Sequence, residues 1–318
     1  MKISLVICTR NRADQLEICL DKINKTTISD ADLEIIIVNN ASVDHTQIVI
    51  QNFISSTKLV TKTLVAERPG LGYARNCGLS VSTGDLIVFT DDDCYLEEDY
   101  FKNLLNNFNP EICQYGMGQI LLYDPEDDAR VANAKIEKIS MIPPKTAVVP
   151  AGTIQGANMF FLRKVFDVAG NFNENMGAGT TFPCEDIEMA ARASHYGFTG
   201  GCLPGFTVYH HHGRKKDSPE ADKVVASYDY GRGAYYASLL SMGVFSAWDF
   251  WGQTLLENGE LRNKIKLDRL SRELIGASQY IDFLLKDEKF QISKSSNANR
   301  LKIHLKNILR RLLRYLDQ

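Results

Sequence analysis

The sequence has no apolar run long enough to cross a membrane, which takes about 18 uninterrupted apolar residues. Even the stretch 237–251 is broken by Ser241, Ser246 and Asp249. Residues 1–12 also lack the features of a signal peptide, because their apolar run is too short and is followed by a basic segment. We therefore expect a cytoplasmic protein without a membrane-spanning helix.

Paired cysteines and an excess of one charge are missing as well. The seven cysteines are odd in number, scattered and free of any Cys-x-x-Cys spacing, which argues against a disulfide framework and a zinc site. Lys and Arg total 36 against 39 Asp and Glu, a formal net charge of -3, so we expect no nucleic-acid partner. With 22 glycines and 9 prolines in 318 residues, the composition excludes fibrous and disordered classes.

Short apolar runs alternate with helix-like stretches over the first half of the chain. The runs are rich in Val and Ile and cover 3–8, 33–38, 64–65 and 86–89. Between the first two, Leu16, Leu20 and Ile23 fall at helical spacing. This alternation predicts an α/β fold with a parallel sheet, whose ligands lie at the carboxyl ends of the strands. The residues expected at those ends are 9–12, 39–42 and 91–93, all of them mainly polar.

The pattern changes near residue 218. We expect the region before it to form one domain, 1–217, and 218–318 to be a helical C-terminal region. Its last helix, within 299–318, has a Leu face and a Lys/Arg face. Such a helix indicates either peripheral contact with an anionic membrane or packing of the Leu face on the domain.

Three consecutive carboxylates, Asp91, Asp92 and Asp93, follow the fourth apolar run, and no basic residue is near them in the sequence. Such a cluster usually needs a cation, and oxygen ligands favour Mg²⁺ or Mn²⁺ with substrate phosphates completing the shell. The alternative is a solvated loop in which Asp93 or a neighbour caps a helix that begins near Leu96.

Three histidines, His210, His211 and His212, follow a predicted strand at 206–209. Because strand residues alternate between faces, His210 and His212 are expected on one side and His211 on the other. One of the pair is a candidate ligand of the metal site at Asp93, since neutral imidazole binds metals. Three solvated histidines are the alternative.

Glu185 and Asp186 lie between the Gly-rich loop 177–179 and a predicted helix at 187–195. An acid at this position is an ordinary N-cap, and the helix dipole would lower its pKa. In a cleft, however, a carboxylate can take the proton of an attacking hydroxyl group, and burial would raise its pKa. Asp186 is therefore our candidate base.

The glycine-rich segment 68–78 matches neither of two common nucleotide motifs. Arg75 stands where Gly-x-Gly-x-x-Gly requires its third glycine, and the Gly-Lys-Ser/Thr of a P-loop is absent. Arg68, Arg75 and Asn76 are candidates for nucleotide contacts. A turn followed by a helix with surface arginines is the alternative.

Together these segments resemble the inverting family 2 glycosyltransferases of the GT-A fold, over about residues 1–213. The pieces that carry the resemblance are 6–12, 38–46, 74–78, 91–93, 156–159, 177–180, 185–186 and 209–210. The resemblance implies a mostly parallel Rossmann-like sheet flanked by helices, with a nucleotide-binding half in 1–95 and an acceptor half in 96–217. It also implies sugar transfer from a nucleotide-diphosphate-sugar to a hydroxyl of a glycan or lipid-linked glycan, in cell-surface polysaccharide synthesis.

The resemblance further assigns roles to residues. It implies Asp186 as the catalytic base, and Asp91, Asp93 and His210 or His212 as ligands of Mn²⁺ or Mg²⁺. With the candidates above, the expected donor-binding residues are Thr9, Arg10, Asn39, Asn40, Arg68, Arg75, Asn76, Asp91, Asp92, Gly156, Asn158 and Glu185. Asn39 departs from the family pattern, which commonly has Asp there, and an amide does not identify the nucleobase.

Two other functions stay open. A nucleotidyltransferase also gathers carboxylates around a metal and a nucleoside phosphate, but the Gly-rich basic loop expected after the first strand is absent. A non-catalytic nucleotide-sugar-binding or assembly protein could keep the same fold, although the presence of Asp93, Asp186 and His210 argues against it. The sequence leaves the donor base and sugar, the acceptor and the oligomeric state open.

Overall fold

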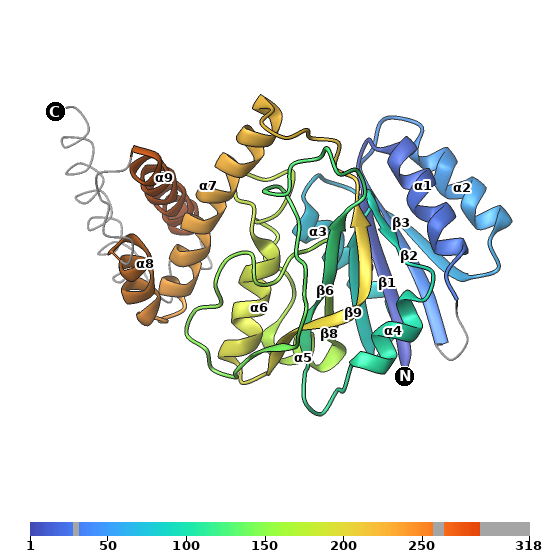
Figure 1. Cartoon of the computed structure of the whole chain (residues 1–318), viewed down its shortest axis with the longest axis horizontal. Helices are drawn as coiled ribbons and strands as arrows, with labels where there is room; N and C mark the ends of the chain where they lie inside the picture. Colours follow the sequence, from blue (N-terminus) through green and yellow to red (C-terminus); the bar gives the residue numbers. More distant parts are fainter. Residues whose placement is uncertain (28–31, 257–263, 287–318) are drawn as a thin grey trace.

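A computed structural model describes residues 1–27, 32–256 and 264–286, and its centre is a nine-stranded sheet (Figure 1). The strands are β1 (Lys2–Thr9), β2 (Asp32–Asn40), β3 (Val60–Ala66), β4 (Leu86–Asp91), β5 (Cys94–Leu96), β6 (Tyr115–Leu122), β7 (Ser140–Ile142), β8 (Asn158–Leu162) and β9 (Gly200–His210). The helices are α1 (Ala13–Asn24), α2 (Thr46–Ser56), α3 (Leu71–Val81), α4 (Tyr100–Asn107), α5 (Arg163–Ala169), α6 (Glu185–His195), α7 (Pro219–Ser241), α8 (Ser246–Leu256) and α9 (Lys264–Lys286). The strand order is β3-β2-β1-β4-β8-β6-β9-β5, and β7 pairs with β9.

The first half of the sheet is parallel, as the apolar runs predict. β1 lies between β2 and β4, and all three are nearly free of exposed residues because helices cover both faces. Their register places Thr9 opposite Asn39 and Cys8 opposite Asp91. The polar residues that follow these strands therefore meet at one edge of the sheet.

The second half of the sheet mixes strand directions. β8 is antiparallel to β4 and β6, whereas β6 and β9 are parallel. The short strand β5 runs antiparallel to β9 and places Cys94 opposite His210. Since Cys94 directly follows the acid triplet, this pairing brings the triplet beside the histidines.

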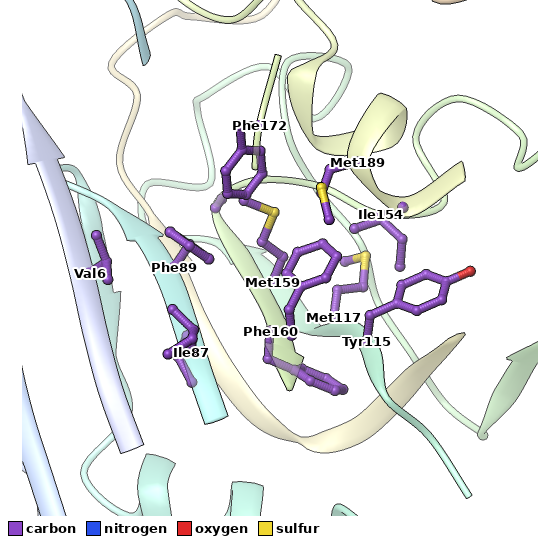
Figure 2. Close-up of a cluster of buried hydrophobic side chains, with 14 of the residues drawn as sticks. Val6, Ile87, Phe89, Tyr115, Met117, Ile154, Met159, Phe160, Phe172 and Met189 are labelled. Carbon is purple, nitrogen blue, oxygen red and sulfur yellow. The ribbon is translucent and has the colours of Figure 1, made fainter. Parts of the chain in front are cut away.

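A cluster of large apolar side chains joins the sheet to the helix that carries Asp186. Phe89 on β4, Met117 on β6 and Met159 on β8 are each at most 1% exposed. Figure 2 shows these side chains together with Phe172 and Met189, the latter from α6. A close-packed interior resists displacement, so α6 holds a fixed position relative to the strands.

The helices after β9 stand at the opposite end of the molecule from α1 and α2 (Figure 1). α7 begins after Ser218, whose hydroxyl accepts a hydrogen bond from the Ala221 amide at 3.2 Å, an ordinary N-cap. On α9, Leu270, Leu274 and Ile281 are buried and recur at helical spacing, so they form one apolar face. Among the described helices, none has the length and hydropathy of a membrane span. The basic helix predicted within 299–318 lies outside the described residues.

Candidate functional site

The candidate site forms where β1, β2 and β4 end. Thr9, Asn39 and Asn40 are buried there, at 2%, 4% and 5% exposure. The Asn39 amide donates to Gln47 at 2.9 Å and its oxygen accepts from the Ser42 amide at 3.0 Å, so its polar groups are occupied by the loop. The Asn40 oxygen, in contrast, is buried with no hydrogen-bond partner. Asn40 is thus the residue of this pair with an acceptor left for a ligand.

Beside these strand ends, four possible metal ligands converge. One ligand atom from each of Asp91, Asp93, Cys94 and His210 lies within 4.8 Å of those of the other three. His210 Nε2 is 3.2 Å from Asp93 Oδ1, and its buried Nδ1 has no partner. Burial raises the pKa of the Cys94 thiol well above its usual value, and sulfur is a soft ligand that Mg²⁺ and Mn²⁺ do not favour. Two carboxylates and an imidazole remain, a donor set that suits Mn²⁺ or Mg²⁺.

The alternative structure for the acid triplet, a solvated loop that caps a helix near Leu96, is wrong. Asp92 and Asp93 are only 5% and 4% exposed, so they are not part of a solvated loop. Asp93 caps no helix either, because Cys94–Leu96 is a strand and α4 begins at Tyr100.

Although no basic residue is near the triplet in the sequence, the fold brings Arg12 against it. Arg12 Nε lies 3.0 Å from Asp92 Oδ1, and the Arg12 guanidinium also bonds Asp93. Burial nevertheless raises the pKa of Asp92 to about 7, despite the charge of Arg12. Burial opposes ionisation of Asp93 too, but its bonds to His210 and the charge of Arg12 outweigh it and lower the pKa to about 2. Arg12 belongs to a motif used for the resemblance, yet nothing in the sequence pointed to its contact with residues 80 positions away.

The histidines follow the predicted alternation. His210 and His212 are both 7% exposed and their ring centres are 5.1 Å apart, whereas the His211 ring contacts Tyr95 on the other side. They are therefore not three solvated histidines. Nδ1 of His212 accepts from the Arg214 amide at 3.1 Å, and its buried Nε2 has no partner. The structure places His210, and not His212, in the four-residue ligand group.

Asp186 lies in the first turn of α6, and the N-cap position is held by Cys184. One carboxylate oxygen of Asp186 accepts from the Gly156 amide at 2.8 Å, and the other accepts from the Ile187 amide at 2.7 Å. Burial raises the pKa of Asp186 above its ordinary value, against the opposing effects of Arg75 and the two amides. The basicity of this carboxylate is therefore raised, which is the direction that favours a proton acceptor.

Arg75 connects this base to the metal-ligand group. Its side chain is 2% exposed, bonds Glu185 directly, and lies 3.4 Å from both Asp91 Oδ1 and the Gly156 carbonyl oxygen. Burial raises the pKa of Glu185 to about 7 although Arg75 opposes this. Arg75 is thus not a surface arginine. Its position indicates that it holds the carboxylates in place and that few of its N–H groups are free to bind a nucleotide.

Three other candidates lie outside this cluster. Arg10 is exposed, and Arg68 bonds Glu174 and lies over the Tyr73 ring, with its Cζ 4.1 Å from the ring centre. The Asn76 amide bonds both Phe172 and Glu174, so Asn76 fixes that loop.

Asn158 corrects an expectation. Its side chain is fully buried, accepts from the Tyr100 hydroxyl at 2.6 Å and donates to the Gln119 carbonyl at 2.8 Å. It holds β8 within the sheet and has no surface for a sugar. A buried Asn and a pocket Asn look alike in sequence, because only the fold shows which partners surround the amide.

Comparisons with known proteins agree with this geometry. The model of a family described as Glycosyl transferase family 2 matches residues 4–168, just over half of the chain. The EpsH protein of Bacillus subtilis is 27% identical over 161 residues, which cover 48% of this chain and 44% of EpsH. The mannosyltransferase PcManGT from Pyrobaculum calidifontis, solved with GDP-Man and Mn²⁺, has a TM-score of 0.57 at 16% identity over 96% of this chain and 86% of its own. S. aureus TarS 1-349, solved with UDP-GlcNAc, has a TM-score of 0.53 at 14% identity over 99% of this chain and 92% of its own.

The likeness to these solved structures defines the class: an α/β protein of the GT-A type, as the resemblance implied. Within that class, the chain belongs to glycosyl transferase family 2. It spans less than half the length of EpsH.

Proposed function

We propose that this chain transfers a sugar from a nucleotide-diphosphate-sugar to an acceptor hydroxyl group, with inversion at the anomeric carbon. The observation that carries the proposal is the bond network of Arg75, which joins Asp91 of the ligand group to Glu185, next to Asp186. A candidate base and a candidate diphosphate-metal site therefore lie side by side at the carboxyl edge of the sheet, where open α/β sheets bind ligands.

Asp91, Asp93 and His210 would hold Mn²⁺ or Mg²⁺ in this proposal. When bound, the divalent cation neutralises charge on the departing diphosphate. PcManGT, which has a similar fold, was solved with GDP-Man and Mn²⁺, and this supports a divalent cation in the proposed reaction.

Asp186 would accept the proton of the attacking hydroxyl group. Its hydrogen bonds from the Gly156 and Ile187 amides leave lone pairs on both carboxylate oxygens and fix the direction of the side chain. Attack by the acceptor opposite to the departing diphosphate inverts the anomeric carbon in a single displacement. A base whose pKa is raised, and whose side chain is held in one orientation, suits this step.

We further propose a glycan or lipid-linked glycan acceptor at the cytoplasmic membrane face, in cell-surface polysaccharide synthesis. TarS, which is 24% identical over 103 residues, is a poly(ribitol-phosphate) beta-N-acetylglucosaminyltransferase, and this supports a polymeric acceptor. Residues 299–318 would supply peripheral membrane contact. Deleting them should abolish co-sedimentation with anionic liposomes, and unchanged binding would remove that role.

Thermal stability with UDP, GDP, dTDP, CDP and ADP, each with and without Mn²⁺, tests the donor site. A ligand that binds only the folded state raises the melting temperature, so a selective, metal-dependent rise is expected for one nucleotide. No rise with any of them would overturn the proposed donor site. Detection of sugar transfer with the corresponding donor then separates an enzyme from a nucleotide-sugar-binding protein without turnover.

A further inference from the structure

We propose that α7, the first helix of the C-terminal region, is a positioning element of the catalytic site: through Gly231 it holds the turn that directs Asp186. The inference rests on the proposed function, because it concerns the base of that reaction. It extends the functional unit beyond the residue 217 boundary expected from the sequence.

The turn in question has an unusual backbone. Cys184, directly before Glu185 and Asp186, has φ 91° and ψ 31°, a left-handed conformation in a residue that is not glycine. Such a conformation is unfavourable on its own and persists only where surrounding structure enforces it. The Cys184 carbonyl still accepts the Glu188 amide at 3.2 Å, so this strained residue starts the helix that carries the base.

The enforcing contact comes from α7. Gly231 is buried in the middle of this helix, and a Cβ added there would collide with the Pro183 carbonyl oxygen and lie 2.8 Å from Cys184 Sγ. The helix backbone therefore rests directly against the Pro183–Cys184 peptide. Glycine inside a helix lowers helix propensity relative to alanine, and this close approach is the structural reason for it here.

α7 also supports the partner of Asp186. The hydroxyl of Tyr235, which is fully buried, donates to the Val149 carbonyl at 2.9 Å. Val149 belongs to the loop that leads to Gly156, whose amide donates to Asp186. α7 thus contacts both the turn before Asp186 and the loop that leads to Gly156. The contact between these two segments fixes the direction of the Asp186 carboxylate. Figure 1 shows α7 running beside α6.

This arrangement accounts for the two closely spaced glycines of α7, Gly231 and Gly233. Gly231 and Gly233 have separate partners, because a Cβ at Gly233 would collide with the Glu273 carbonyl oxygen on α9. Gly233 therefore permits α7–α9 packing, whereas Gly231 permits contact with the turn before Asp186. This difference supplies a matched control on the same helix.

The test compares Gly231→Ala with Gly233→Ala and Gly252→Ala in the full chain. Gly252 lies on α8 with no atom within 4 Å of an added Cβ, so it gains helix propensity without a clash. For Gly231→Ala we expect kcat to fall by the order of 10²-fold, with nucleotide binding and donor KM close to wild type. Gly233→Ala is expected to lower the melting temperature while keeping most of kcat, and Gly252→Ala to keep kcat without lowering the melting temperature.

Hydrogen exchange gives a readout that does not depend on turnover. Gly231→Ala should accelerate exchange of the Gly156 and Glu188 amides, whereas Gly233→Ala should leave them protected. Wild-type kcat in Gly231→Ala, or an equal loss of kcat in Gly233→Ala, would overturn the inference.

If Gly231→Ala does not fold, Tyr235→Phe tests the same helix by removing only the hydroxyl that bonds Val149. We expect it to lower kcat and to accelerate Gly156 exchange, and unchanged values for both would again overturn the inference. Failure of the proposed function is recognised separately, because it would leave the wild type itself without transfer.

Discussion

The backbone amide of Gly156 donates a hydrogen bond to the carboxylate of Asp186 at 2.8 Å, joining two segments that are 30 residues apart. The Gly156 carbonyl also lies 3.4 Å from Arg75, so the backbone of one residue contacts both the candidate base and the central arginine of the site. The placement of the base therefore depends on backbone geometry as well as on its own helix.

Asp186→Asn should abolish most transfer while leaving nucleotide binding intact. Loss of a general base typically costs about 10²- to 10⁴-fold in rate. Both carboxylate oxygens of Asp186 accept backbone amides and Asn keeps only one acceptor oxygen, so the variant loses one of these hydrogen bonds and its melting temperature should fall modestly. Initial rates at saturating donor, with nucleotide affinity measured separately, check this. A variant that keeps wild-type kcat would assign the base elsewhere.

The raised pKa of Asp186 predicts the pH dependence of the wild type. Protonated Asp186 cannot accept a proton, so kcat should fall as the pH decreases through its raised pKa. The acid limb is expected above the ordinary Asp value of about 3.8. A pH–kcat profile at saturating donor checks this. An acid limb at or below 3.8 would show that burial does not govern this group.

Arg75→Met should unfold or severely destabilise the protein. The substitution leaves Glu185 and Asp91 without their buried partner, and breaking a buried ion pair costs roughly 3–5 kcal/mol. Arg75→Met combined with Glu185→Gln should recover part of that loss, because a neutral amide replaces the unpaired carboxylate. Urea denaturation of both variants measures the free energy of unfolding. Equal stability of the single and double variants would contradict the pairing.

Metal binding should respond in opposite directions to two substitutions at one contact. Arg12→Met removes a cation bonded to Asp92 and Asp93, so Mn²⁺ should bind several-fold more tightly than to the wild type. Asp93→Asn removes a ligand carboxylate and should weaken Mn²⁺ binding. Calorimetric titration with Mn²⁺ alone distinguishes them. Equal Mn²⁺ affinity in wild type and Asp93→Asn would place the cation elsewhere.

The ionisation of Glu34 should make the free energy of unfolding depend on pH in the acid range. It is 1% exposed, accepts from the Ser4 hydroxyl at 2.6 Å and lies 2.8 Å from Lys62 Nζ. Burial opposes its ionisation, but these partners prevail and lower its pKa from 4.5 to about 2. A lowered pKa stabilises the folded state above pH 4.5, and that contribution is lost as the pH falls toward 2.

Glu34→Gln should therefore be less stable than the wild type at pH 7, by the order of 2–3 kcal/mol. The difference should shrink between pH 4.5 and 2. Denaturation at several pH values checks this, and a constant difference would contradict the linkage.

The parallel half of the sheet and the positions of Asp91, Asp93, Asp186 and His210 could be predicted because local patterns specify them. Apolar runs mark the strands, and in a parallel sheet the residues after them share one edge. The face of His210 followed from strand alternation alone. The family match and the solved structures confirm the family and fold that these patterns suggested.

The partners of buried polar groups could not be predicted. Arg12 and Arg75 are far in sequence from the carboxylates that they bond, and no periodic pattern encodes those distances. The sequence around Asn158 suggested a residue that lines a pocket. Its side chain is instead buried and forms hydrogen bonds with Tyr100 and Gln119. Residue type indicates what a polar group can bind, and tertiary structure selects the partner.

The sheet has a polar cluster at each end. Glu34 pairs with Ser4 near the amino-terminal ends of β2 and β1, whereas Asp91 lies at the carboxyl end of β4. Between them lie strand residues that are almost entirely apolar and buried. Substitutions that change stability at the Glu34 end should therefore leave the contacts around Asp91 intact, and substitutions at the Asp91 end should leave the Glu34 contacts intact. Because distant, independent sites add in free energy, gains made at one end should carry over to variants selected at the other.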